Sequence, residues 1–137
     1  MKRLFIYKGF DEKTYQKIAI SSGGGQISSD VRYMRMICFR AVGTKKKIYA
    51  ERIDNIAAIM GYMTSDALRI VGVCVSKEYK GRGLARFLVK RALQYARDNG
   101  AKKVVTRTKD GVDFYQRVAG ARITGMTGED FIMEMDV

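Results

Sequence analysis

The sequence predicts an α/β (α+β) fold in which helices and strands are mixed along one chain. Some segments repeat apolar residues with the period of two that is typical of strands, and others with the helical period of 3.6. An apolar, β-branched strand at Val71–Val75 runs directly into a glycine turn and a helix. The length of 137 residues suits one core and is too short for two, so we expect a single domain over residues 1–137.

The first forty residues predict one short strand and two amphipathic helices. The strand covers Leu4–Lys8, and the helices cover about Asp11–Ile20 and Val31–Arg40. Between the helices, Ser21–Ser29 is rich in glycine and serine and is expected to be a flexible connection. The residues expected to face the core are Tyr15, Ile18, Ala19, Met34, Ile37 and Cys38.

The middle of the chain predicts a hairpin followed by a third strand. The hairpin strands are Ile48–Asp54 and Asn55–Met63, with the turn near Asp54 and Asn55. Gly61 marks a position where a neighbouring backbone comes close. The next strand is Leu68–Val75, which leads into the glycine turn.

The last third predicts a helix, a strand, a short helix and a closing hairpin. Their ranges are Leu84–Asn99, Ala101–Thr108, Asp110–Val118, Arg122–Thr127 and Phe131–Val137. Asn99 with Gly100 is a natural stop for the longer helix. Asp110 is the expected cap of the short helix, and Gly120 its terminator.

The turn between the third strand and the longer helix has the features of an anion site. Gly81 and Gly83 permit backbone angles and close approaches that a Cβ would forbid. Leu84 then begins a helix whose free amides and positive dipole end favour a phosphate or pyrophosphate. Three cationic side chains surround this turn: Lys80, Arg82 and Arg86.

The motif differs from two common phosphate-binding sequences. Gly-Lys-Ser/Thr of the P-loop is absent, and the dinucleotide fingerprint Gly-x-Gly-x-x-Gly fails at Arg86. The segment Lys80-Gly-Arg-Gly-Leu-Ala85 instead resembles motif A of the GNAT superfamily of N-acetyltransferases, Arg/Gln-x-x-Gly-x-Gly/Ala, and Val73–Tyr79 resembles the preceding strand. The order of predicted elements is also similar to that of the GNAT fold, which implies a central mixed, mostly antiparallel sheet flanked by helices.

A second segment, Val112–Ala121, is similar to the late GNAT helix that carries Ala-x-x-Phe/Leu-Tyr-Glu-x-x-Gly-Phe. The match places Tyr115 on the family tyrosine, which is usually assigned to protonating the CoA sulfur. The chain departs from the family pattern at Lys77, Lys80 and Ala121, and it lacks the asparagine often found after the penultimate α/β strand.

The resemblance implies an enzyme that moves an acetyl group directly from acetyl-CoA to a primary amine, without a metal. In the family, the turn amides hold the pyrophosphate and the strand pairs with the pantetheine arm. By this resemblance Tyr115 is the catalytic residue. The implied acetyl-CoA-binding residues are Val73, Cys74, Val75, Lys80, Gly81, Arg82, Gly83, Leu84, Ala85 and Arg86.

Composition excludes several other chemistries. The chain has no histidine, which removes the usual zinc sites and any Ser-His or Cys-His nucleophile. Cys38 and Cys74 give neither a disulfide framework nor a metal-ligand spacing. No apolar run is long enough for a transmembrane helix and the start does not resemble a signal peptide, so a cytoplasmic location is expected.

The formal charge of +12 leaves nucleic acid open as a partner. From Lys77 to Lys109 the chain carries eleven Lys or Arg residues against Glu78 and Asp98, so much of the excess lies near the glycine turn. The alternatives are therefore a basic nucleic-acid-binding module, an acetyltransferase whose acceptor amine is carried on RNA, and a CoA-binding domain without turnover. The acceptor, which can be a small molecule or a peptide, and the oligomeric state are not indicated by any motif.

The general base is also open at this point. Glu51, Asp66 and Asp113 are candidates only because they are carboxylates, and no spacing favours one of them. A substrate α-amine with a pKa of about 7.7–8.0 is roughly one-tenth neutral at pH 7, so a dedicated base is not required for such an acceptor.

Overall fold

The computed structural model describes residues 3–23, 26–41 and 47–137, which form a seven-stranded sheet and four α-helices. The elements in chain order are β1 (Ile6–Lys8), α1 (Glu12–Ser21), α2 (Gln26–Ala41), β2 (Lys47–Ile53), β3 (Ala57–Met63), β4 (Ala67–Val75), α3 (Leu84–Asp98), β5 (Lys103–Thr108), α4 (Val112–Ala119), β6 (Arg122–Thr127) and β7 (Asp130–Asp136). A short 3₁₀ turn at Lys77–Tyr79 precedes α3.

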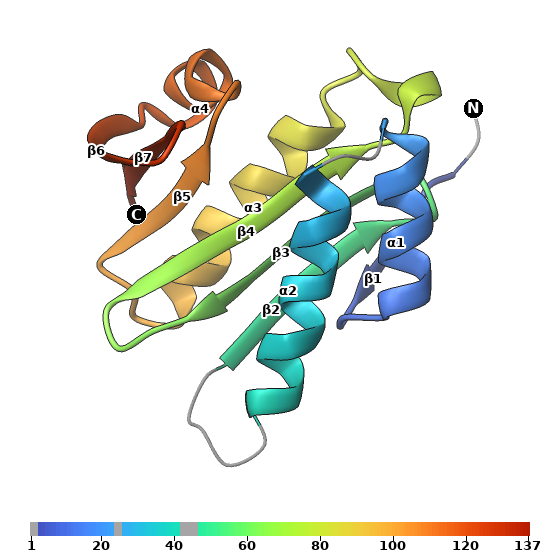
Figure 1. The fold of residues 1–137 in the computed structure, drawn as a ribbon, viewed down its shortest axis with the longest axis horizontal. Helices are drawn as coiled ribbons and strands as arrows, with labels where there is room; N and C mark the ends of the chain where they lie inside the picture. Colours follow the sequence, from blue (N-terminus) through green and yellow to red (C-terminus); the bar gives the residue numbers. More distant parts are fainter. Residues whose placement is uncertain (1–2, 24–25, 42–46) are drawn as a thin grey trace.

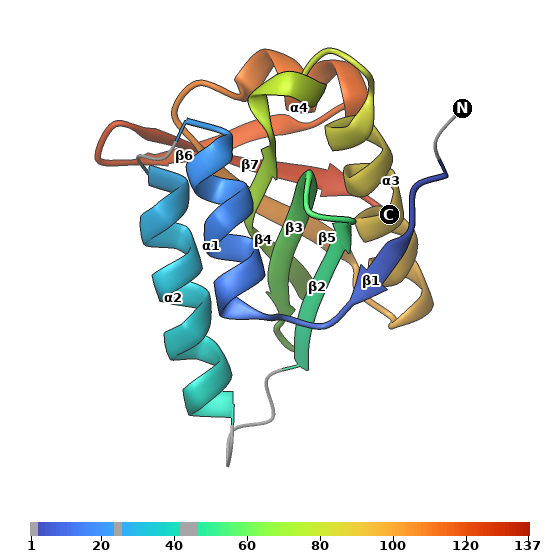
Figure 2. The same ribbon diagram turned by 90° about the vertical axis from the view of Figure 1, so that its right-hand side faces the viewer.

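The strands are ordered β1-β2-β3-β4-β5-β7-β6 across the sheet. All neighbours are antiparallel except β4 and β5, which run parallel with α3 as their crossover. The expected mixed, mostly antiparallel sheet is therefore confirmed. Helices α1 and α2 cover one face, and α3 covers the other (Figures 1 and 2).

Each face of the sheet has its own hydrophobic core, built from the apolar stripes of the helices. Under α1 and α2 lie the buried side chains of Tyr15, Ile18 and Met34. Under α3 and α4 lie residues such as Leu88 and Met133. Spacing of i, i+3 and i+4 along each helix places these residues on one stripe, which agrees with the predicted inward faces. None of the described helices is long and apolar enough to cross a bilayer.

Two predicted helix starts are wrong. Helix α2 begins at Gln26 and not at Val31, so the expected loop through Ser29 is helical from Gln26 onward; residues 24–25 lie outside the described part. Serine and aspartate suit the first turn of a helix as well as a loop, and composition alone does not separate the two. The residue that caps α4 is Gly111 and not Asp110; its amide donates to the Thr108 hydroxyl at 2.8 Å.

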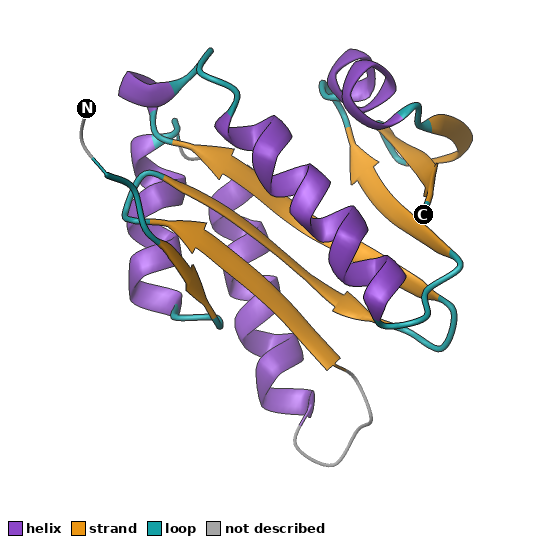
Figure 3. Cartoon of the chain, turned by 180° about the vertical axis from the view of Figure 1, so that it is seen from behind, coloured by secondary structure: helices purple, strands orange, loops and turns teal. Residues whose placement is uncertain are grey.

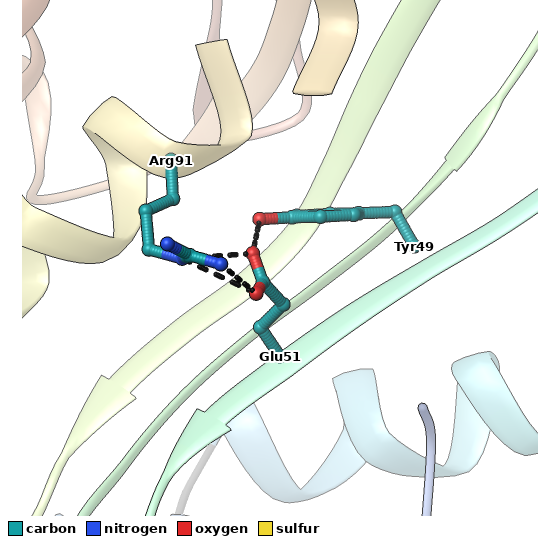
Figure 4. A network of polar contacts seen from close by, with 3 residues as sticks. All are labelled: Tyr49, Glu51 and Arg91. Carbon is teal, nitrogen blue, oxygen red and sulfur yellow. Dashed lines mark hydrogen bonds and ion pairs between the residues drawn. The ribbon is translucent and has the colours of Figure 1, made fainter. Parts of the chain in front are cut away.

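One buried ionic cluster fixes α3 to the sheet (Figure 4). Arg91 of α3 donates through Nη2 to Oε2 of Glu51 at 2.6 Å and through Nε to both carboxylate oxygens at 3.2 Å. The hydroxyl of Tyr49, two residues earlier on β2, donates to the same carboxylate. The Glu51 side chain is 5% exposed, so its charge depends on these two partners.

Candidate functional site

A β-bulge interrupts β4 in the middle of the sheet. Gly72 is opposite Met60 and Ile70 is opposite Gly61, which leaves Val71 as an extra residue on β4. The sequence alone predicts strict alternation of Val71, Val73 and Val75, and the bulge breaks it: Val71 packs toward α1 and α2, whereas Val73 packs toward α3. A bulge increases local twist and redirects the strand.

Parallel pairing between β4 and β5 ends at the bulge. Its register runs only from Ala67 with Lys103 to Ile70 with Thr106. Beyond Ile70 the two strands diverge (Figures 1 and 3). We call the opening between them the V; its apex is the last pair, Ile70 with Thr106. On the side of β5, the stretch from Val71 to Val75 has no partner strand among the described residues.

Gly61 makes the bulge possible, and its predicted close approach is confirmed. A Cβ at this position would overlap the carbonyl oxygen of Arg69 on β4. No side chain could occupy that space without moving the backbone. The glycine on β3 thus fixes where β4 bends, at Val71, ten residues later in the chain.

The open edge of β4 presents backbone groups to the V. The amide of Ser76 donates to the carbonyl of Ile56 at 2.7 Å, on the β3 side. Because backbone groups alternate along a strand, Val73 and Val75 direct theirs the other way, into the V. Cys74 directs its backbone to β3 and its side chain to the core under α1 and α2. Burial raises the pKa of its thiol to about 12, which keeps it protonated.

The glycine turn follows directly and opens α3 with free donors. Gly81 and Gly83 have φ angles of 79° and 80°, the left-handed region that favours glycine. A Cβ on either would meet no atom within 4 Å, so the space above the turn is open. The first helical hydrogen bond runs from Phe87 to the Gly83 carbonyl at 3.0 Å. The earlier amides of Leu84, Ala85 and Arg86 therefore remain available to a ligand.

Basic side chains at this turn form no ion pair with the described residues, unlike several others in the same segment. Within the described residues, four of the basic side chains between Lys77 and Lys109 form ion pairs: Arg91, Lys103, Arg107 and Lys109. At the turn, Arg82 lies over the Tyr79 ring at 5.1 Å. Lys80 donates to the carbonyl of Ser22 at 3.0 Å, which links the turn to the end of α1.

Tyr115 lies at the apex of the V, in the second turn of α4. Its side chain is buried and hydrogen-bonded to Thr106, the last β5 residue that pairs with β4. Thr106 Oγ1 also lies 3.4 Å from the carbonyl oxygen of Ile70. Burial raises the pKa of the Tyr115 phenol, and the hydrogen bond with Thr106 lowers it by a smaller amount. The phenol is therefore a weak acid and a good hydrogen-bond donor.

A cavity of about 620 Å³ adjoins the apex on the α2 face of the sheet. Its walls come from α2, β3, β4, β5, β6 and β7, and include Asp30, Tyr33, Ile70, Val71, Thr106 and Arg107. The Asp30 carboxylate lies against the strand at Gly72: a Cβ on that glycine would be 3.6 Å from Oδ2. Burial and the charge of Asp130 raise the pKa of Asp30 to about 6, against a lowering by Arg107.

The carboxylates considered from sequence lie elsewhere. Glu51 is held by Arg91 and Tyr49 in the opposite face of the sheet. Asp66 is exposed in the β3–β4 turn, and Asp113 is exposed in an ion pair with Arg117 at 3.0 Å. None of the three lines the cavity beside the apex.

Sequence reasoning did not identify Asp30 or Thr106. Asp30 is a single acidic residue in the first turns of a helix, and no local pattern separates it from a solvated one. Thr106 lies near the end of a predicted strand, and this position alone does not indicate that its hydroxyl faces the site. Among the described residues, no group of three or more acidic or cysteine side chains is arranged to hold a metal ion.

Comparison with known families identifies the fold around this site. The family profile described as the acetyltransferase (GNAT) family matches residues 28–121, which include the bulge, the glycine turn and Tyr115. No curated protein sequence matches the chain.

Solved structures with a similar fold span the whole chain. The PaiA N-acetyltransferase of Thermoplasma acidophilum, in complex with coenzyme A, has a TM-score of 0.76 at 17% identity, covering 99% of this chain and 100% of that one. A GNAT family N-acetyltransferase of Escherichia coli, in complex with CoA, has a TM-score of 0.71 at 17% identity, covering 98% and 81%. A GNAT family acetyltransferase of Elizabethkingia anophelis, with acetyl-CoA bound, has a TM-score of 0.64 at 14% identity, covering 98% of both chains. At these identities the likeness establishes the fold.

Proposed function

The chain belongs to the GNAT acetyltransferase family, and on that premise we propose that it is an acetyl-CoA-dependent N-acetyltransferase that acts on a primary amine by direct transfer. The observation that carries this proposal is the continuity of the open β4 edge with the glycine turn. A long ligand with an amide-bearing arm and a pyrophosphate fits such a surface. Similar structures with bound CoA support the same cosubstrate.

Each part of acetyl-CoA has a matching set of groups. The pyrophosphate would sit on the amides of residues 81–86, with Arg82 and Arg86 adding charge. The pantetheine arm would lie along β4, where Val73 and Val75 offer backbone groups. This places the thioester toward the bulge at Val71, where β4 and β5 separate.

The chemistry requires positioning and modest charge stabilisation. A β4 amide donated to the thioester carbonyl would stabilise the oxyanion that forms on attack. Tyr115, at the apex, would donate a hydrogen bond to the departing sulfur. A phenol of pKa ~10 is a weaker acid than a thiol of pKa ~8.5, so full proton transfer is uphill by about 2 kcal/mol before burial is counted. Because burial raises the phenol pKa further, we assign Tyr115 as a hydrogen-bond donor to the thiolate.

Ligand-induced thermal stabilisation tests the cosubstrate. CoA or acetyl-CoA at about a hundred times its Kd should contribute roughly 2.7 kcal/mol of stability, which for a chain of this size is an increase in Tm of roughly 10 °C. Replacing Gly83 by Asp should abolish the shift, because the side chain and its charge would occupy the open space above the turn.

The matched control is Gly100→Asp at the other end of the same helix. Gly100 has a φ of 76° and, like Gly83, no atom within 4 Å of a Cβ. It should lose similar stability from backbone strain and keep the full CoA shift. An unchanged Tm of the wild-type protein in excess CoA would contradict the proposed function.

A further inference from the structure

The cavity beside the bulge opens at the place where an acceptor must reach the thioester. Val71 at the bulge and Thr106 at the apex form part of its wall. A nucleophile has to come within about 3–3.5 Å of the carbonyl carbon before attack. The cavity lies on the α2 face of the sheet, whereas the glycine turn lies beyond the carboxyl end of β4. The acceptor and the cosubstrate can therefore approach the same point from different directions.

Asp30 is the acidic residue of α2, and its side chain lies close to the bulge in β4. Its Cβ and Oδ2 lie 3.5 and 3.6 Å from the position of a Cβ on Gly72, the residue between the bulge and Val73. This position requires a glycine, because a Cβ would also lie 2.9 Å from Cε of Met60. The bare strand lets the Asp30 carboxylate pack directly against the backbone that borders the V.

The Asp30 carboxylate has no polar partner among the described residues. It makes no hydrogen bond or ion pair with the residues that the structure describes. In contrast, Asp130 accepts from Arg107 Nε at 2.7 Å, and Glu51 is held by Arg91. Arg107, one of the two arginines that line this cavity, is therefore already paired. A carboxylate that is partly buried, unpaired and facing a cavity is a site for a cation.

We propose that Asp30 is the catalytic base of the acetyl transfer and that its cavity receives the acceptor as a primary amine; this proposal rests on the function proposed above. The ammonium form of the acceptor binds beside the carboxylate, loses one proton through Asp30 to the solvent, and reacts as the neutral amine. This assignment names a residue on α2, outside both segments that resemble the family motifs.

The groups facing Asp30 leave it ionised but basic at neutral pH. Arg107 of β5 lowers its pKa, and Asp130 of β7 raises it. Asp30 in turn raises the pKa of Cys74 on β4 and of Tyr115 on α4. The other charged or titratable residues of the cavity wall are the exposed Arg69 and Tyr33 and the half-buried Tyr62 of β3. Burial is the largest influence, and a carboxylate with a pKa of about 6 accepts a proton far more readily than an ordinary aspartate.

The transfer step balances with these groups and no further reactant. The amine lone pair forms the N–C bond at the thioester carbonyl, and the nitrogen becomes positively charged. Asp30 takes one proton from that nitrogen. The C–S bond then breaks, its electron pair leaves on sulfur, and the thiolate accepts the hydrogen bond of Tyr115 until solvent protonates it, while Asp30 gives its proton back to solvent. The products are the N-acetyl amine and CoA.

Kinetics of Asp30→Asn test the assignment. The assay measures CoA release from acetyl-CoA with a panel of primary amines: propylamine, putrescine, lysine, glycinamide and a short peptide. With whichever amine the wild type acetylates, Asp30→Asn should lower kcat by about 10²–10⁴-fold and abolish the rise in rate near pH 6. Asp30→Glu, which keeps a carboxylate, should retain more activity. Asp66→Asn, in the exposed β3–β4 turn, is the matched control and should behave as wild type.

The outcomes separate this inference from the proposed function. Wild-type rates and an unchanged pH profile in Asp30→Asn would overturn the role of Asp30 and leave the acetyltransferase intact. A raised KM with unchanged kcat and pH profile would reduce Asp30 to an amine-binding group and would also overturn it. If CoA does not raise the Tm of the wild-type protein, that result would instead contradict the proposed function.

A direct titration tests Asp30 whatever the acceptor proves to be. In protein labelled with carboxyl-¹³C aspartate and saturated with CoA, the signal missing from the Asp30→Asn variant should titrate with a midpoint well above that of the other aspartates. A midpoint near the ordinary value of about 3.9 would overturn the proposal.

Discussion

Asp30 carries its charge in surroundings that disfavour the charge. Its raised pKa means that the folded protein binds a proton more tightly than the unfolded chain does, so the free energy of unfolding falls as the pH rises from about 4 to 6. Above that window the ionised carboxylate destabilises the fold. A group that destabilises the protein and makes no described hydrogen bond is more readily explained by chemistry than by packing.

Asp30→Asn is therefore expected to stabilise the protein while it lowers activity. The increase in the free energy of unfolding should be present at pH 8 and should shrink as the pH falls through 6 toward 4, where wild-type Asp30 is itself protonated. Urea unfolding of both proteins at pH 4.5, 6 and 8 measures this. A variant that is less stable than wild type at pH 8 would assign Asp30 to a structural interaction.

Tyr115→Phe should lower kcat and leave the CoA-induced Tm shift nearly unchanged. The hydroxyl is proposed to act on charge that develops on sulfur, and not on the bound ground state. Loss of the donor should cost about 10²-fold in kcat or more. Thr106→Val gives a useful comparison, since it removes the group that holds the Tyr115 hydroxyl in place. Wild-type turnover of Tyr115→Phe would assign this tyrosine to packing in the core under α3 and α4.

At the scale of elements, α3 depends on the Glu51 cluster for its position. Arg91 donates to a carboxylate that is almost fully buried, so removing the arginine leaves an uncompensated charge. Arg91→Met should cost about 3 kcal/mol of stability, measured by urea unfolding. Arg97→Met on the exposed side of the same helix, where the arginine donates to Gln94 at 3.0 Å, should cost less than about 0.5 kcal/mol.

The double variant Glu51→Gln with Arg91→Met checks the reason for that loss. Without the negative charge, the missing guanidinium should matter less, and part of the lost stability should return. Equal costs for Arg91→Met and Arg97→Met would show that the cluster contributes nothing to the anchoring of α3.

The elements themselves were largely predictable because their signals are local. The strand, glycine turn and helix from Val71 to Asp98 follow from neighbouring residues, and the helix with Tyr115 has its own short pattern. The bulge at Val71 does not, because it is set by the register with Gly61 on another strand. Asp30 and Gly72 lie 42 residues apart in the sequence and meet only when α2 packs on β4. The acceptor side of the site is made of such long-range contacts, which no local motif records.

For the whole molecule, the distribution of charge predicts how polyanions bind. The formal charge is +12, but several basic residues form ion pairs, whereas Lys77, Lys80, Arg82 and Arg86 at the glycine turn form none with the described residues. RNA binding should therefore be weak at physiological salt and fall steeply as salt rises. CoA should compete with it, because both would use Arg82 and Arg86. Binding of CoA and of mixed RNA over a salt series measures this, and tight, salt-resistant RNA binding without CoA binding would favour the nucleic-acid alternative.

Where β4 separates from β5, the stretch from Val71 to Val75 lacks a partner strand on that side among the described residues. If the pantetheine arm lies along β4, its amides would occupy the place of a partner strand beyond Ile70, where β4 and β5 no longer pair; their described pairing covers Ala67 with Lys103 to Ile70 with Thr106. Hydrogen exchange measures this directly. The amides of Val73 and Val75 should become protected when CoA binds, as they would in a paired strand. The Ser76 amide, already bonded to Ile56, should exchange as before.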